Sequence, residues 1–228
     1  MDDSTVEKQY SRLLEVRDMH GQEQLGLMMN QAWFDDPKRL VFTFARYKFV
    51  AKMMSGFDHV LEVGCGDAFP SRIVRQSVNK LSITDFDPIF IDDINNRAIE
   101  QWSFENVFVY DLLAGPLEGA YNGVYALDVL EHIEEKDEDA FLSNMSAALA
   151  SDGTMIIGMP SLESQKYASK LSIEGHVNCK TQSDLKKTME RHFQNVYMFS
   201  MNDEVLHIGF DKMSQYVIAL CNTPKNRS

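Results

Sequence analysis

The 228-residue sequence has few cysteines and a shortage of positive charge, and both limit what the protein can be. Its three cysteines, Cys65, Cys179 and Cys221, include no C-x-x-C pair, so neither a disulfide framework nor a thiolate zinc site is indicated. The formal net charge of −12 opposes binding to a long nucleic acid, because phosphate contacts draw on Lys and Arg. This composition predicts a protein of a reducing cytosol.

Long hydrophobic runs and dividing linkers are also missing. No apolar stretch approaches the roughly 20 residues that cross a bilayer, and the start M-D-D-S-T-V-E-K-Q is acidic and polar. No internal repeat, low-complexity tract or Pro/Gly-rich segment divides the chain. We therefore expect a soluble cytoplasmic unit without a membrane or nucleic-acid partner, and its oligomeric state stays open.

Short β-rich runs alternate with helical stretches from about residue 58 onward, which is typical of a parallel sheet covered by helices. The last two β-rich runs leave no room for a helix between them, so they must pair antiparallel. The pattern predicts an α/β fold with a seven-stranded, mostly parallel sheet, an antiparallel strand near the C-terminus and helices on both faces. The expected strands are 58–63, 80–85, 105–110, 122–128, 153–159, 195–201 and 215–221, and the expected helices are 70–78, 88–100, 136–150 and 181–192.

The residues before the first strand form a helical extension in this interpretation, with helices at about 2–17 and 38–55. We take residues 1–56 as this extension and residues 57–228 as one compact domain. The methionine pairs Met28/Met29 and Met53/Met54 suit flexible core packing. The functional alternative is a lid that folds across the edge of the sheet and shields a reactive cofactor.

A glycine turn follows the first strand in V-L-E-V-G-C-G-D-A-F-P (residues 60–70). A dinucleotide fingerprint requires a third glycine beneath the pyrophosphate, but Phe69 holds that position. Glu62 at the mouth of the turn would repel a phosphate, whereas it could pair with a ligand ammonium group. A nicotinamide-dependent oxidoreductase is therefore a weak alternative.

The E-x-G-x-G pattern resembles motif I of the class I S-adenosylmethionine (SAM) methyltransferases, whose later motifs follow in order between about residues 45 and 222. The resemblance implies SAM as the cofactor, with its methionyl end at the glycine turn, its ribose on Asp85 and its adenine beside Asp111 and Leu112. The family's frequent third glycine is Ala68 here. The implied cofactor residues are Glu62, Gly64, Cys65, Gly66, Asp85, Phe86, Asp111, Leu112, Asp128 and Arg46.

The fourth strand ends in D-V-L-E-H, and a later histidine follows the fifth strand in E-G-H-V-N. The first phrase stands where amino-methylating nucleic-acid enzymes have N/D-P-P-Y, so that branch is disfavoured. Asp128, Glu131, His132 and His176 are instead similar to the metal-binding set of ubiquinone-pathway and small-RNA O-methyltransferases. The resemblance implies methyl transfer to a hydroxyl of a small, sugar-like or diol metabolite, with a divalent metal such as Mg²⁺ as an aid.

Other roles for these residues stay open. His132 or His176 could act as a general base without a metal, with Asp128 as a third catalytic residue, or the group could be purely structural. A metal-free N- or carboxyl-methyltransferase of a small metabolite is the corresponding alternative function. Weaker candidates for substrate or cofactor contacts are Arg46, Tyr47, Asn202, Asp203 and His207.

Overall fold

The structure, a computed structural model, describes residues 5–98 and 100–225. It confirms the α/β class but corrects the strand count, because the single sheet has eight strands in the order β3-β2-β1-β4-β5-β8-β6-β7. The additional strand is a three-residue segment that extends the C-terminal hairpin at the sheet edge. The strands are β1 (His59–Val63), β2 (Lys80–Asp85), β3 (Asn106–Val109), β4 (Tyr121–Leu127), β5 (Leu149–Pro160), β6 (Phe193–Asn202), β7 (Val205–His207) and β8 (Tyr216–Pro224).

The strand directions place several chain segments at one edge of the sheet. Strands β1 to β5 pair in parallel, β8 is antiparallel to β5, and β6 is antiparallel to β8. Strand β6 therefore runs in the same direction as the first five, as its sequence predicts. The loops after β1, β2, β4, β5 and β6 consequently meet at the carboxyl edge, where open α/β sheets bind ligands.

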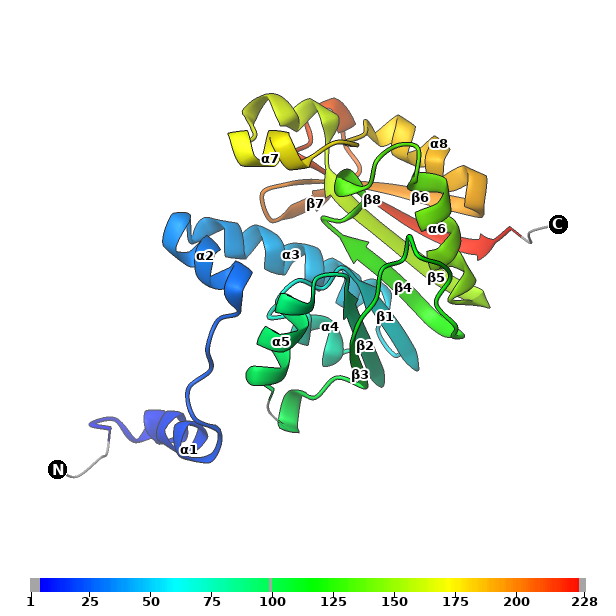
Figure 1. Cartoon of the computed structure of the whole chain (residues 1–228). Helices are drawn as coiled ribbons and strands as arrows, with labels where there is room; N and C mark the ends of the chain where they lie inside the picture. Colours follow the sequence, from blue (N-terminus) through cyan, green and yellow to red (C-terminus); the bar gives the residue numbers. More distant parts are fainter. Residues whose placement is uncertain (1–4, 99, 226–228) are drawn as a thin grey trace.

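Two apolar layers cover the sheet, because successive strand residues face opposite sides. In β1, Val60 faces the layer that includes α3 (Lys38–Met53), and Leu61 faces the layer of α6 (Glu138–Ala147). Figure 1 shows the two helical layers on either side of the twisted sheet. The remaining helices are η1 (Lys8–Tyr10), α1 (Ser11–His20), α2 (Leu27–Asp35), α4 (Arg72–Arg75), α5 (Pro88–Asn96), η2 (Glu100–Trp102), η3 (Leu130–His132), η4 (Leu162–Tyr167), α7 (Lys170–Gly175), α8 (Gln182–His192) and η5 (Asp211–Met213).

The N-terminal extension has a different structure from the one expected. The first expected helix begins in residues 2–4, which lie outside the described residues, and α1 stands away from the body with no buried residue (Figure 1). A second helix, α2, lies between the two expected helices, where none was expected. Helix α3 places buried residues such as Tyr47 and Val50 in the main core, whereas the buried residues of α2 pack with Leu40 in a separate small cluster.

Several helices are shorter than the sequence suggests. The expected helix at 70–78 contains only α4, and the one at 88–100 ends at Asn96, before residue 99, which lies outside the described residues. Between β5 and α8 the chain forms η4 and α7, which the sequence analysis did not identify. No helix in the described part of the chain is long and apolar enough to cross a membrane.

Candidate active site

The glycine turn after β1 requires glycine at both of its positions. Gly64 and Gly66 have φ values of 70° and 53°, in the left-handed region that disfavours side chains. A Cβ atom on Gly64 would lie 2.4 Å from Cγ2 of Val129, and one on Gly66 would lie 2.4 Å from Sδ of Met28. The turn is therefore held between the loop after β4 and the N-terminal helix α2. Ala68 also has a positive φ, of 50°, so its backbone takes a conformation that a glycine would favour.

Asp85, the expected ribose ligand, lies directly beside this turn. Its Oδ2 accepts a hydrogen bond from Gly66 N at 2.9 Å, and its Oδ1 accepts one from Asp87 N at 3.0 Å. Each carboxylate oxygen has further acceptor capacity. The Asp85 carboxylate thus fixes the turn, and its contact with the ribose hydroxyls stays a prediction.

The expected adenine side is formed by the ends of β2 and β3. Phe86 is 72% exposed and Asp111 is exposed, whereas Leu112 is buried and its carbonyl accepts a hydrogen bond from Asn144 Nδ2. Asp111 Oδ1 accepts a hydrogen bond from Leu113 N at 2.9 Å, which orders the loop. Phe86 and Asp111 are therefore open to a ligand.

The side chains of two expected cofactor residues are not open in this way. Cys65 is buried, and its burial raises the pKa of the thiol well above its ordinary value. Glu62 is buried and accepts hydrogen bonds from Tyr47 Oη at 2.7 Å and from Tyr125 Oη at 2.6 Å. Burial raises the Glu62 pKa to about 7. Glu62 therefore joins α3 to the sheet, and its contact with a ligand ammonium group stays a prediction.

Arg46 and Asp128 form an ion pair between α3 and the end of β4. Arg46 Nη1 lies 3.0 Å and 2.8 Å from the two carboxylate oxygens of Asp128, and the guanidinium carbon lies 3.8 Å from the ring centroid of Tyr216. Asp128 has a φ of 57°, and its N donates to the carbonyl of Gly158. Two sequence-predicted residues are therefore in contact with each other at the cofactor side.

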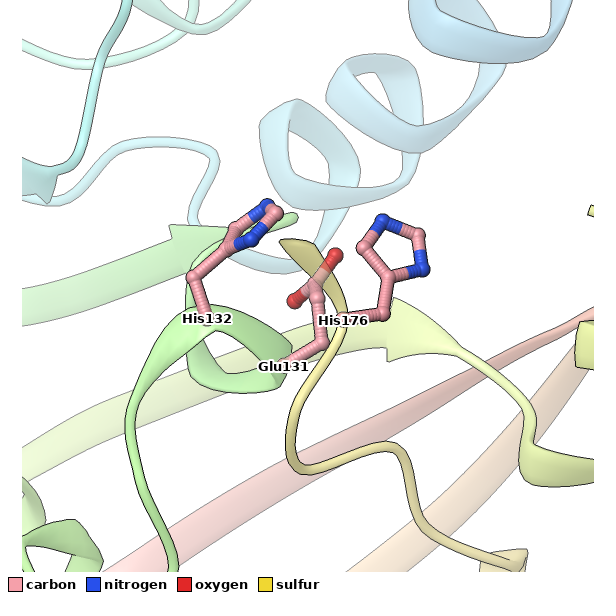
Figure 2. A group of neighbouring side chains, drawn as sticks. All are labelled: Glu131, His132 and His176. Atoms are coloured by element: carbon pink, nitrogen blue, oxygen red, sulfur yellow. The ribbon is translucent and has the colours of Figure 1, made fainter. Parts of the chain in front are cut away.

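A second group contains the other predicted acceptor-side residues. Glu131, His132 and His176 each offer a ligand atom, and these atoms all lie within 4.8 Å of one another. Figure 2 shows the Glu131 carboxyl group between the two imidazole rings, whose centroids are 5.1 Å apart. Asp128 does not belong to this group in the described part of the chain, because Arg46 holds its carboxylate. The structure therefore brings together three of the four predicted metal ligands.

The Glu131 carboxyl group is buried without compensation. The residue is 0% exposed, and neither carboxylate oxygen has a hydrogen-bond partner among the described residues. Burial, and next the charge of Asp128, raise the Glu131 pKa well above its usual range. Burying a carboxyl group without hydrogen-bond partners costs folding free energy, so the Glu131 carboxyl group is a candidate to bind a ligand or a metal ion.

The two histidines are oriented by hydrogen bonds at Nδ1. His132 Nδ1 lies 2.8 Å from the carbonyl oxygen of Gly175, and His176 Nδ1 lies 2.9 Å from Gln165 Oε1. Since these oxygens accept, Nδ1 of each ring carries the proton and Nε2 of the neutral ring keeps its lone pair. Burial, and next the charge of His132, lower the His176 pKa, which favours its neutral form.

The loop that carries His176 is anchored to the site at several points. Asn178 N donates to the carbonyl oxygen of Glu131 at 3.0 Å, and Lys180 forms an ion pair of 2.8 Å with the buried Glu138 of α6. Sequence reasoning found His176 but missed Gln165 and Gly175, which orient the two rings. Both contacts depend on η4 and α7, and no motif in the sequence indicates them.

The terminal loop does not present its polar residues as expected. Gly209 N donates to His207 Nδ1, so His207 Nε2 carries a proton and donates to Asn202 Oδ1 at 2.7 Å. Asn202 Nδ2 donates to the carbonyl oxygen of Met213, and Gln215 Nε2 donates to Asp203 Oδ1. These polar groups hold the loop together, and substrate contacts by them stay a prediction.

Comparisons with known proteins agree with this fold. Residues 61–155 match a family model described as a methyltransferase domain, and no curated protein sequence matches the chain. Among solved structures, the N-methyltransferase NodS of Bradyrhizobium japonicum WM9, in complex with S-adenosyl-L-homocysteine (SAH), has a TM-score of 0.65 and 18% identity, covering 84% of this chain and 93% of that chain.

Two further structures are similar. The methyltransferase domain of bacterial CtHen1-C has a TM-score of 0.66 at 15% identity, covering 81% of this chain and all of that one (100%). The DhpI–SAH complex has a TM-score of 0.63 at 13% identity, covering 87% of this chain and 92% of that chain. The fold is therefore that of the class I SAM-dependent methyltransferases. Together with the match of residues 61–155 to the methyltransferase domain, this fold supports a SAM-dependent methyltransferase activity.

Proposed function

We propose that this enzyme transfers the methyl group of SAM to a hydroxyl of a small polar metabolite, of sugar-like or other diol type, with the help of a divalent metal. The metal would be held by Glu131, His132 and His176. The observation that carries the proposal is the buried Glu131 carboxyl group, which has no hydrogen-bond partner among the described residues and lies between two imidazoles.

The donor set fits a divalent cation chemically. One carboxylate and two neutral imidazoles suit ions such as Mn²⁺, Fe²⁺, Co²⁺ or Zn²⁺ better than Mg²⁺, which prefers oxygen ligands. The hydrogen bonds at His132 Nδ1 and His176 Nδ1 are of the kind that orients metal-binding histidines. A bound ion would lower the pKa of the acceptor hydroxyl and fix a neighbouring oxygen.

The chain itself would supply mainly positioning. Methyl transfer from a sulfonium is an in-line displacement, so catalysis depends on holding the acceptor oxygen behind the methyl group and on excluding water. The Arg46–Asp128 pair and the buried Glu62–Tyr47 contact both join α3 to the sheet, at the ends of β4 and β1. We assign these two contacts to holding α3 across the reaction site.

We also propose that α2 and α3 act as a lid over the cofactor. Met29 N of α2 donates to Asp67 Oδ2 at 2.8 Å, which satisfies a free N–H group of the helix end from within the glycine loop. The sulfur of Met28 packs on Gly66, directly beside the expected methionyl end of SAM. A lid at this position would shield the sulfonium from water.

Metal-free methyl transfer is the competing interpretation. The neutral form that is favoured for His176 would allow it to accept a proton from an amine or a hydroxyl without a metal. NodS, which has a similar structure, is an N-methyltransferase, but at 18% identity the similarity shows only a common fold. The two interpretations differ in their response to chelation.

The test measures SAH formation from SAM with a panel of vicinal diols, catechol and simple amines, before and after exhaustive chelation. We expect turnover with a hydroxyl acceptor, loss of at least tenfold on chelation, and recovery on adding Mn²⁺. Glu131→Gln should abolish the recovery, whereas His20→Gln, an exposed histidine on α1 outside the group, should retain it. Full activity after chelation, or methylation of nitrogen only, would refute the proposal.

A further inference from the structure

Exposed apolar side chains are concentrated in two loops at the carboxyl edge of the sheet. Ten of the 26 exposed large apolar side chains of the described residues lie in residues 162–177 and 205–213. These two segments contain about a ninth of the chain. We call these ten side chains the apolar rim; its most exposed members include Tyr167 and Ile208, each 81% exposed, and Leu171, 77% exposed.

Hydrogen bonds tie both loops of the apolar rim to the reaction site and to each other. Gly175, the last residue of α7, accepts the hydrogen bond of His132 through its carbonyl oxygen. Ser161, which precedes η4, donates through Oγ to the carbonyl oxygen of Ser214, directly after η5. Residues 162–177 therefore lie beside the Glu131–His132–His176 group, and the second loop is joined to them through Ser161 and Ser214. Figure 1 shows α7 and β7 at the same end of the sheet.

Several polar side chains of these loops are used in local hydrogen bonds. Gln165 accepts from His176, Ser169 and Ser172 bond to each other, and His207 donates to Asn202. The ten side chains of the apolar rim remain exposed beside them. Concentrations of exposed apolar residues on a monomer mark a binding surface, because their contact with water is unfavourable.

The charge of the protein indicates what covers this surface. A net charge of −12 opposes attachment to an anionic membrane, and the loop at 203–213 itself carries Asp203, Glu204 and Asp211 against one lysine, Lys212. The apolar rim also adjoins the Glu131–His132–His176 group, which is proposed to hold the metal that binds the acceptor hydroxyl. An apolar part of the acceptor fits both the negative charge of the protein and this position beside the group.

We propose that the methyl acceptor joins its hydroxyl-bearing head to an alkyl chain, and that this chain lies against the apolar rim. The inference rests on the proposed hydroxyl acceptor and narrows its class from a purely polar metabolite to an amphiphilic one. Each methylene that leaves water on binding should tighten binding by up to about fourfold. Partial cover on an open rim lowers this to about twofold.

The experiment measures the binding of 1,2-butanediol, 1,2-hexanediol, 1,2-octanediol and 1,2-decanediol to the enzyme loaded with SAH and Mn²⁺, by titration calorimetry below the concentrations at which the diols form micelles. We expect affinity to rise about two- to fourfold per methylene. Leu171→Ser combined with Phe210→Ser should flatten this dependence on chain length. The matched control, Leu13→Ser with Met19→Ser on α1, should leave it unchanged.

Chelation separates this inference from the proposed function. Removing Mn²⁺ should weaken all four diols by one common factor without changing the dependence on chain length. If chelation has no effect but the dependence remains, the metal proposal fails and the apolar rim stands. A chain-length dependence that is absent, or that the Leu171/Phe210 variant retains, overturns the inference. So does sedimentation showing a dimer that only this variant dissociates, because the rim would then be a subunit interface.

Discussion

Tyr47 of α3 donates a hydrogen bond to Glu62 of β1, with 2.7 Å between Oη and Oε1, in a fully enclosed position. Tyr125 donates to the other carboxylate oxygen at 2.6 Å. The charge of Glu62 is thus held by two neutral donors and by no described cation within ion-pair distance. Burial raises the Glu62 pKa to about 7 although these donors lower it, and the two hydrogen bonds link α3 and β4 to the strand before the glycine turn.

Glu62→Gln should change how stability depends on pH. Because the folded pKa of about 7 exceeds the ordinary value of 4.5, the folded state holds a proton that the unfolded state releases. The contribution of Glu62 to stability is therefore full below about pH 4.5 and is lost as pH rises towards 7. From pH 5 to pH 8, the free energy of unfolding of the wild type should fall by about 2 kcal/mol relative to Glu62→Gln. Urea unfolding at both pH values measures this, and an unchanged difference between the proteins would contradict the assignment.

Gly66→Ala should weaken cofactor binding for two separable reasons. The positive φ strains any side chain, and the new Cβ would meet the sulfur of Met28. We expect a loss of stability of about 2 kcal/mol and a loss of SAH affinity of at least tenfold. Adding Met28→Ala to this variant should recover the part of the lost stability that is due to the contact between the new Cβ and the Met28 sulfur. The control Gly56→Ala has a φ of 82° but no neighbour within 4 Å, so it should show only the backbone effect in thermal unfolding and leave SAH affinity intact.

Asp128→Asn should destabilise the joint between α3 and the sheet. The variant leaves the partly buried Arg46, with 18% of its side chain exposed, without its charged partner. After allowance for the 35% exposure of Asp128, we expect a cost of about 1–2 kcal/mol in denaturant unfolding. Glu105→Gln, which breaks the exposed pair with Lys80, should cost clearly less, because solvent screens that pair. Equal effects of the two variants would show that the Arg46–Asp128 pair has no special role.

Binding of SAH should alter the surroundings of α2, one of the two helices proposed to form the lid. Trp33 lies on α2, 54% exposed, on the same helix as Met28. In a Trp102→Phe background, its fluorescence should shift when SAH binds, and Met28→Ala should weaken SAH binding several-fold. A saturating SAH titration measured by calorimetry serves as the control for binding. Binding with no change in Trp33 emission would argue that α2 is a static wall and no lid.

The sequence predicts the cofactor half of the site better than its surroundings. Gly64, Gly66 and Asp85 follow from local rules, because a tight turn between strand and helix restricts both residue type and backbone conformation. The role of Glu62 could not be predicted in this way. Its tyrosine partners come from α3 and β4, and only packing in three dimensions brings them to one carboxyl group.

The acceptor half shows the same division. D-V-L-E-H indicated Glu131 and His132 correctly as neighbours, but the pairing of Asp128 with Arg46 depends on how α3 crosses the sheet. The sequence did not indicate that Asn202 and His207 of the terminal loop bond to each other, or that Ile208 and Phe210 are exposed. A linear pattern does not reveal which polar groups satisfy one another.

The most direct test of the central claim is a crystal of the enzyme grown with SAH and Mn²⁺ and measured for anomalous scattering. The account predicts a single strong peak within bonding distance of the Glu131 carboxylate and of Nε2 of both His132 and His176, and no peak in crystals of Glu131→Gln. A well-occupied SAH site with no peak at these three residues, or with a peak that persists in Glu131→Gln, would contradict it.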